Sequence, residues 1–231
     1  MSDAAGKNTG QTQLRPAGPI FVTRVRPSDE AVQTAEVTVL FADLRGYTAL
    51  AERLPAVRVV SLLHEFFDVL AGAIDTFGGE VYHMAGDGIM AGFGMKPNCG
   101  GNARDALAAG HAMLNNFAPM ADRWRSELSI DAGIGVGLHL GEVAYGVLGP
   151  RQRKTTTIVG DTVNVAARLC SRARAGELLF SCTVAAALNG TVGAAADAGA
   201  TPFLQLPQFE LRGRRSPIDI WCVPAPGRLA L

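Results

Sequence analysis

The sequence lacks an excess of charge of either sign. Lys plus Arg and Asp plus Glu each number 21 in 231 residues, so the formal net charge at pH 7 is zero. Proteins that bind nucleic acid or an anionic membrane through their overall field usually carry a basic surplus. We therefore expect no nucleic-acid partner, and any anionic ligand must be held by local groups.

The four cysteines are scattered along the chain and show no spacing typical of a metal site or of a disulfide framework. No CxxC pair occurs, and no histidine stands at metal-ligand spacing from any of Cys99, Cys170, Cys182 and Cys222. This pattern argues against a disulfide framework or a zinc site and favours a reduced, cytoplasmic setting.

Long hydrophobic runs are also missing. No stretch approaches the roughly 20 apolar residues of a membrane span, and the N-terminus has no charged-then-apolar signal pattern. We expect no membrane segment in this chain. The hypothesis that it is part of a larger, membrane-attached protein stays open.

The composition that remains is that of a globular protein with a sizeable core. Hydrophobic residues make up 48% of the chain and charged residues 18%. Residues 1–33 are rich in Ser, Thr, Gln, Gly and Pro, which predicts a flexible N-terminal tail or linker. Residues 34–225 are expected to form one domain.

Apolar periodicity predicts an α+β fold with a ferredoxin-like βαββαβ core. In chain order the core elements are a strand at 36–42, a helix from Pro55 to Gly78, strands at 80–84 and 89–93, a helix after residue 102 that Pro119 should bend or split, and an alternating strand at 128–140. Extra C-terminal elements follow: a strand near 143–148, the strand of "TTIVG", the helix "DTVNVAARLC" and a last hairpin.

Glycines alternate along one face of the 128–140 strand. Gly133, Gly135 and Gly137 leave no side chains on that face, so another group must approach it closely.

Two aspartates should meet in such a sheet. The third strand lies between the first and second and is antiparallel to both, so Asp43 after the first strand should lie beside Asp87 before the third. Two carboxylates about 4 Å apart repel by roughly 4 kcal/mol at an effective dielectric constant near 20. Protonation of one, or binding of Mg²⁺ or Mn²⁺, relieves this. The simpler alternative is that Asp43 caps a helix and Asp87 is a turn residue.

Two further stretches could bind phosphate. Backbone N–H groups of the "LRGYT" turn after Asp43 could hold phosphate oxygens, which with metals suggests phosphoryl or nucleotidyl chemistry. In "GDTVNVAAR", with Asp161 or Thr162 as helix cap, Asn164 and Arg168 are i and i+4 on one helix face and can contact a ribose and a phosphate. The alternative is an ordinary solvated helix face.

A third stretch, "LRGRRSP", is basic. Its residues Arg212, Arg214 and Arg215 form either a triphosphate clamp or a charged turn.

Five stretches occur in an order that resembles the catalytic domain of the class III nucleotidyl cyclases, the adenylate and guanylate cyclases. They are "FADLRGYT", "GGEVYHMAGDGIMAGFG", "GVGLHLGEVAYGVLG", "TIVGDTVNVAARL" and "FELRGRRSPIDIW", and they cover roughly residues 36–223. The resemblance implies conversion of a nucleoside triphosphate to a 3′,5′-cyclic nucleotide and pyrophosphate.

The resemblance also implies residue roles. Two Mg²⁺ or Mn²⁺ ions per site would bind at Asp43, Leu44 and Asp87, Asn164 would orient the ribose, and Arg168 would stabilise charge on the α-phosphate. The triphosphate-binding residues would be Arg45, Gly46, Tyr47, Thr48 and Arg212. Because family members take the metal aspartates from one protomer and the Asn and Arg from the other, a head-to-tail homodimer is implied.

The base-reading positions depart from the family pattern. Adenylate cyclases usually carry Lys four residues before the second metal Asp and Asp or Thr three before the Gly of the "GDTVN" motif; guanylate cyclases usually carry Glu and a small residue or Cys. This chain has His83 and Thr157. Thr157 favours ATP, whereas a neutral imidazole could face adenine or guanine. We therefore expect an adenylate cyclase. The alternatives are a guanylate cyclase, a pyrimidine nucleotide cyclase and a nucleotide-binding regulatory module with weak catalysis.

Overall fold

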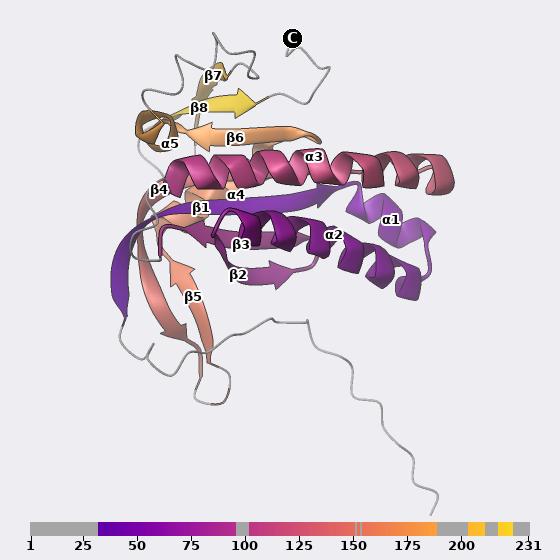
Figure 1. The fold of residues 1–231 in the computed structure, drawn as a ribbon, viewed down its shortest axis with the longest axis horizontal. Helices are drawn as coiled ribbons and strands as arrows, with labels where there is room; N and C mark the ends of the chain where they lie inside the picture. Colours follow the sequence, from indigo (N-terminus) through magenta and orange to yellow (C-terminus); the bar gives the residue numbers. More distant parts are fainter. Residues whose placement is uncertain are drawn as a thin grey trace, which may run out of the picture.

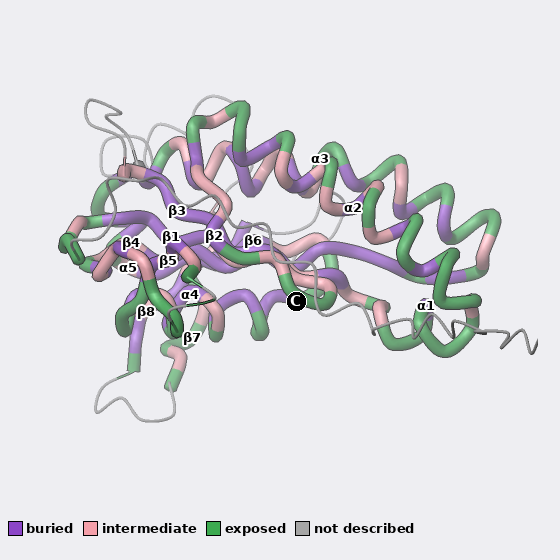
Figure 2. Tube along the Cα trace, turned by 90° about the horizontal axis from the view of Figure 1, so that it is seen from below, coloured by how far each residue is buried: buried purple, intermediate pink, exposed green. Residues whose placement is uncertain are grey.

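A computed structural model describes residues 32–95, 102–150, 152, 154–188, 203–210 and 217–223. Within these residues, one mixed sheet carries helices on both faces (Figures 1 and 2). The elements are β1 (Gln33–Arg45), α1 (Tyr47–Arg53), α2 (Ala56–Thr76), β2 (Glu80–Ala85), β3 (Gly88–Phe93), α3 (Asn102–Leu128), β4 (Gly133–Leu148), β5 (Thr155–Val159), α4 (Asp161–Arg172), β6 (Glu177–Ser181), α5 (Cys182–Ala187), β7 (Leu204–Phe209) and β8 (Ile218–Val223).

The strand order is β2-β3-β1-β4-β6-β8-β7, and β5 pairs with the second half of β4. β3 lies between β1 and β2 and is antiparallel to both. The order β1-α2-β2-β3-α3-β4 is the predicted βαββαβ core, which is therefore confirmed, with the other elements added after it. In the described part of the chain, no helix is long and apolar enough to span a bilayer.

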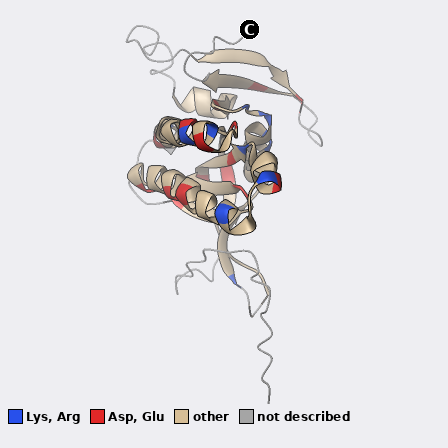
Figure 3. Cartoon of the chain, turned by 90° about the vertical axis from the view of Figure 1, so that its right-hand side faces the viewer, with Lys and Arg blue, Asp and Glu red and all other residues tan. Residues whose placement is uncertain are grey.

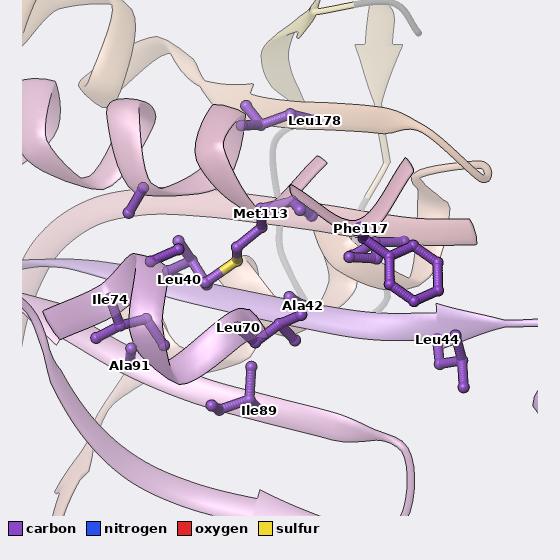
Figure 4. Close-up of a cluster of buried hydrophobic side chains, with 14 of the residues drawn as sticks. Leu40, Ala42, Leu44, Leu70, Ile74, Ile89, Ala91, Met113, Phe117 and Leu178 are labelled. Atoms are coloured by element: carbon purple, nitrogen blue, oxygen red, sulfur yellow. The ribbon is translucent and has the colours of Figure 1, made fainter. Parts of the chain in front are cut away.

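Alternation along β1 separates two faces of the sheet. Leu40, Ala42 and Leu44 pack under α2 and α3, where Figure 4 shows them among buried side chains of both helices. Val37 and Val39 point the other way and pack in a cluster with Ala166 of α4. Because successive strand residues face opposite sides, Asp43 lies on the α4 face.

Several predicted boundaries were wrong. β1 continues through Asp43 to Arg45 because its last residues pair with the start of β4. α3 runs unbroken past Pro119 to Leu128, so the next strand begins at Gly133 instead of residue 128. The strands expected at 128–140 and 143–148 are one strand, since Gly141 lets β4 continue beneath the side chain of Thr162.

The element β6 was not predicted. Leu178 and Phe180 pack in the large core with α2 and α3, whereas Leu179 packs in a cluster with α4 and β8. Both faces of the strand are buried, so its sequence is a short apolar run without the alternation that identifies a half-exposed strand. The short helix α5 directly after it was also missed.

The glycine face of β4 is covered by the chain's own α4. A Cβ atom at Gly137 would lie 2.1 Å from the backbone nitrogen of Cys170 and 2.5 Å from the carbonyl oxygen of Ala166. At Gly135 it would lie 2.5 Å from Nη2 of Arg45. The predicted close approach is therefore confirmed, and the approaching groups are a helix backbone and a guanidinium.

Gly137→Ala is expected to lower the free energy of unfolding by about 3 kcal/mol, because the new methyl group meets helix backbone that cannot move away alone. Gly72→Ala on α2 is the matched control. Nothing lies within 4 Å of that position, so this change should be neutral or stabilise by up to about 1 kcal/mol. Urea unfolding of both variants measures the difference, and equal midpoints would contradict this packing of α4.

Candidate functional site

The predicted aspartate pair lies at one end of the sheet. Asp43 of β1 pairs with Gly88 of β3, the residue directly after Asp87. The amide of Leu44 donates to the carbonyl oxygen of Asp87 at 3.0 Å, which fixes the turn against β1. A Cβ atom at Gly88 would lie 3.3 Å from Oδ1 of Asp43. The structure thus brings both aspartates to one sheet end, as the strand order predicted.

The surroundings of the Asp43 carboxyl shift its pKa. Burial raises its pKa above the ordinary value, the charge of Asp87 raises it further, and the Arg45 guanidinium acts in the opposite direction. Figure 3 looks at the end of the molecule where β1 meets α1 and shows acidic residues on strands between the helices, with basic residues on elements around them. An added cation beside this pair would relieve the repulsion.

The donor set fits a divalent ion of the magnesium type. Within the described ranges, no group of three or more His, Cys, Asp or Glu side chains gathers as a closed metal site. Asp43 and Asp87 alone provide two carboxylates. Mg²⁺ commonly binds through one or two carboxylates and completes its octahedral shell with water and substrate phosphate. An open pair at a sheet end suits such an ion better than a structural zinc site.

The side chain of Arg45 binds partners within the same chain. Its guanidinium forms an ion pair with Asp43 and donates to the carbonyl oxygen of Cys170, and its Nε donates to the carbonyl oxygen of Ala173 at 3.0 Å. The last two partners lie at the C-terminal end of α4. Gly135 makes room for the guanidinium on the sheet below. Of the predicted triphosphate-binding residues, Arg45 thus has its side chain occupied by intramolecular partners.

The predicted phosphate cradle is a tight turn into a helix. Gly46 has φ of 92°, and a Cβ atom there would lie 2.4 Å from the carbonyl oxygen of Asp131, so both its conformation and its surroundings require glycine. α1 begins at Tyr47, and Gly46 supplies no side-chain cap. The first amides of a helix have no acceptor within it, so Tyr47 and Thr48 present N–H groups at the turn.

Asn164 and Arg168 share the exposed face of α4. Val165, Ala166 and Leu169 form its buried face, while Asn164 and Arg168 are exposed. The predicted cap was wrong, because the cap residue is Gly160 and the hydroxyl of Thr162 donates to the Glu142 carbonyl oxygen at 2.6 Å. The buried face of α4 lies toward the sheet that carries Asp43, so this pair points away from the aspartates of the same chain.

The predicted base-reading residues lie on β2 and β5. His83 is exposed, beside an irregularity in the β2–β3 register. Thr157 is half-buried and pairs with Gly146. The side chains of Tyr82, next to His83 on β2, and Ile158, next to Thr157 on β5, both lie over Gly92 of β3: a Cβ atom there would be 2.9 Å from the first and 3.5 Å from the second. The segments that carry His83 and Thr157 are therefore neighbours. Arg212, the remaining predicted triphosphate ligand, lies outside the described residues with Arg214 and Arg215.

One buried polar cluster gave no signal in the sequence. His139 of β4 is 7% exposed, and its Nδ1 lies 2.7 Å from Oγ of Ser181. The hydroxyl of Thr183 lies 2.9 Å from the Ser181 hydroxyl and donates to the Leu140 carbonyl oxygen. These bonds join β4 to β6 and to the start of α5. No spacing rule links residues this far apart along the chain.

Comparisons with known proteins agree on one family. The model of the adenylate and guanylate cyclase catalytic domain matches residues 30–222. Over 147 residues, 60% of this chain and 28% of the relative, the sequence is 33% identical to an adenylate cyclase of Anabaena cylindrica. Similar solved structures include the adenylyl cyclase CyaB from P. aeruginosa (28% identity, TM-score 0.76, 84% of this chain and 95% of that chain). Another is the guanylyl cyclase Cya2 (27% identity, TM-score 0.69, 85% and 94%). The chain spans about a quarter of the length of the curated relatives it matches.

Proposed function

Because the chain belongs to the family of adenylate and guanylate cyclase catalytic domains, we propose that it converts ATP to 3′,5′-cyclic AMP and pyrophosphate. The pairing of Asp43 with Gly88 supports this most directly, since it places the carboxylates of Asp43 and Asp87 at one sheet end, beside the Gly46 turn. Such a site can hold divalent cations together with a triphosphate.

The proposed residue roles follow from position. Asp43 and Asp87, with Leu44 adjoining, would hold Mg²⁺ or Mn²⁺, two ions per site, and such ions assist loss of the ribose 3′-hydroxyl proton and neutralise the triphosphate. The amides of Gly46, Tyr47 and Thr48 would bind phosphate oxygens. The 3′-oxygen then attacks the α-phosphorus, the bond to the β-phosphate oxygen breaks, and pyrophosphate leaves.

Asn164 and Arg168 complete the proposed machinery. The Asn164 amide would orient the ribose, and the Arg168 guanidinium would donate to the α-phosphate oxygens as charge grows in the transition state. Arg212 is proposed to bind the terminal phosphates.

A complete site then needs a second copy of the chain. Asn164 and Arg168 lie on the outer face of α4, whereas Asp43 lies beneath the opposite face of that helix. We propose a head-to-tail homodimer with two sites, in which each protomer supplies aspartates to one site and Asn164 and Arg168 to the other. The β4–β5 hairpin supports this, because it exposes the large apolar side chains of Leu148 and Val159, and Val32, which packs beside Gly146 of β4, is exposed as well.

The test of the substrate is a comparison of all four nucleoside triphosphates with Mn²⁺, scored by cyclic product and by pyrophosphate. ATP is expected to give the highest kcat/KM, with one pyrophosphate released per cyclic AMP. A higher kcat/KM for GTP would identify a guanylate cyclase instead. If none of the four triphosphates gives a cyclic product, the proposal that the chain is an enzyme is contradicted.

His83→Ala is expected to lower kcat/KM for the preferred base about tenfold, the size of one lost hydrogen bond to a base. Binding of Mn²⁺ should not change, because His83 pairs with Met90, three residues along the chain from Asp87, and is not one of the proposed metal ligands. The matched control is His64→Ala, which removes an exposed imidazole from α2. Equal kcat/KM values in both variants for every nucleotide would show that His83 does not read the base.

A further inference from the structure

We infer that Arg45 is an internal cation that competes with divalent ions for Asp43 and, through the same guanidinium, clamps the C-terminal end of α4 to β1. The inference rests on the proposed metal site and adds a device that regulates it. Arg45 is thereby a positioning residue, in place of the phosphate-binding role predicted from the sequence.

The Arg45 side chain is held by several hydrogen-bond acceptors. The Arg45 guanidinium has acceptors in two elements: the Asp43 carboxylate of β1 and the carbonyl oxygens of Cys170 and Ala173 at the end of α4. Helix C-terminal carbonyl groups carry partial negative charge and attract cations. The side chains of Arg45 and Asp43 are 24% and 34% exposed, so water screens their attraction only in part.

Neighbouring groups keep the guanidinium in this place. Any side chain at Gly135 would occupy its space, and the Sγ of Cys170 donates to the Gly135 carbonyl oxygen at 3.3 Å, tying α4 to the same strand position.

The two oxygens of Asp43 are not equivalent. Oδ2 accepts from Arg45, whereas Oδ1 is the oxygen nearest Gly88, on the Asp87 side. A cation that bridges the aspartates through Oδ1 can bind with Arg45 in place. A cation that uses Oδ2 must displace the guanidinium. We therefore expect one ion to bind readily and a second only in competition with Arg45.

Displacement has a consequence for α4. When the guanidinium loses Asp43 as an acceptor, the ion pair no longer orients it toward the carbonyl groups at the end of α4, and the tie between β1 and the last turn of that helix weakens. Arg168 lies on α4 two residues before Cys170. Occupation of Asp43 by metal is thus coupled to the placement of a residue that the homodimer would present to the partner's site.

Two substitutions of Arg45 separate the effect of its charge from the effect of its hydrogen bonds. Arg45→Met removes both the charge and the hydrogen bonds. Arg45→Lys keeps a positive charge near Asp43 but replaces the planar guanidinium fork with a single nitrogen, so it is expected to lose hydrogen bonds to the end of α4. Arg53→Met is the matched control, since Arg53 donates to the Ser129 carbonyl oxygen at 2.8 Å and its removal takes one charge from the same end of the molecule.

The measurements are Mn²⁺ binding by electron paramagnetic resonance and amide hydrogen exchange in residues 169–173, on the whole chain without nucleotide. Arg45→Met should bind Mn²⁺ about tenfold more tightly, as expected when a positive charge leaves the neighbourhood of a divalent ion. Arg45→Lys should bind Mn²⁺ like wild type. Both variants should exchange faster at the end of α4, and Arg53→Met should match wild type in both measurements.

The outcomes distinguish the inference from the proposed function. Mn²⁺ binding that depends on Asp43 but has the same affinity in Arg45→Met would overturn the competition and leave the metal site intact. Unchanged exchange at residues 169–173 in both variants would overturn the clamp. If wild type and Asp43→Asn bind Mn²⁺ equally, the proposed metal site fails and the inference fails with it. A thermal melt of each variant confirms that it is folded.

Discussion

Asparagine in place of Asp43 or Asp87 is expected to lower cyclic AMP formation about a thousandfold. Each substitution removes one of the two carboxylates proposed to hold the divalent ions, which supply several kcal/mol of transition-state charge stabilisation, and 1.36 kcal/mol corresponds to tenfold in rate. The measurement is kcat/KM for ATP at saturating Mn²⁺. Asp68→Asn, on the exposed side of α2, is the control and should keep wild-type activity.

The same substitution at Asp43 should not destabilise the fold. Burial and Asp87 raise the Asp43 pKa more than Arg45 lowers it, so without metal the ionised carboxylate costs folding free energy at neutral pH. Well below the ordinary carboxyl pKa, Asp43 is protonated in both the folded and the unfolded state, and wild type and Asp43→Asn should be equally stable. As the pH rises through the raised folded pKa, wild type should lose stability relative to Asp43→Asn.

Thermal melts in EDTA at several pH values measure this difference. Added Mn²⁺ should then raise the midpoint of wild type and leave Asp43→Asn unchanged, because only a protein with the site gains stability from the ion. A lower midpoint for Asp43→Asn than for wild type at every pH would contradict this prediction, and if the variant is unfolded at the assay temperature, its inactivity gives no support to a metal role.

Mixing two inactive variants is expected to restore activity. In the proposed homodimer, Asp43→Asn damages the metal half of each site, and Arg168→Ala damages the half supplied by the partner. A mixed dimer has one site with both defects and one with neither. At equal concentrations half of the dimers are mixed, so about a quarter of wild-type activity should return.

The control for this result is a mixture of Asp43→Asn with Asp87→Asn. Both changes fall on the same half-site, so every dimer has two damaged sites and the mixture should stay inactive. Recovery in the control, or none in the first mixture after the chains have exchanged, would contradict a site shared between protomers. Full wild-type activity in a protein that sedimentation shows to be monomeric would contradict it as well.

The sequence was sufficient to predict the core of the fold and the meeting of the aspartates. Strand order follows from the βαββαβ pattern, and antiparallel pairing then requires Asp43 to lie beside the residue after Asp87, which the register confirms. The family predicted from five motifs in order is confirmed as well. The roles of Asn164, Arg168, His83, Thr157 and the turn residues stay predictions.

Features that depend on distant contacts could not be predicted. β6 is buried on both faces and so has no alternating pattern. Arg45 stands in a motif that suggests a phosphate ligand, yet its partners Cys170 and Ala173 follow more than a hundred residues later. The signal that was present lay elsewhere: the alternating glycines of β4 marked the surface on which α4 and the guanidinium lie.

The most direct test of the proposed function is to follow Mn²⁺ binding and cyclic AMP formation in parallel in wild type, Asp43→Asn and Asp87→Asn. We predict that wild type binds Mn²⁺ and forms cyclic AMP and pyrophosphate in equal amounts, and that each variant loses both properties together while remaining folded. Mn²⁺ and ATP binding without cyclic product in wild type would instead identify a regulatory nucleotide-binding module. Cyclic AMP formation at the wild-type rate in both variants would contradict catalysis at the aspartate pair.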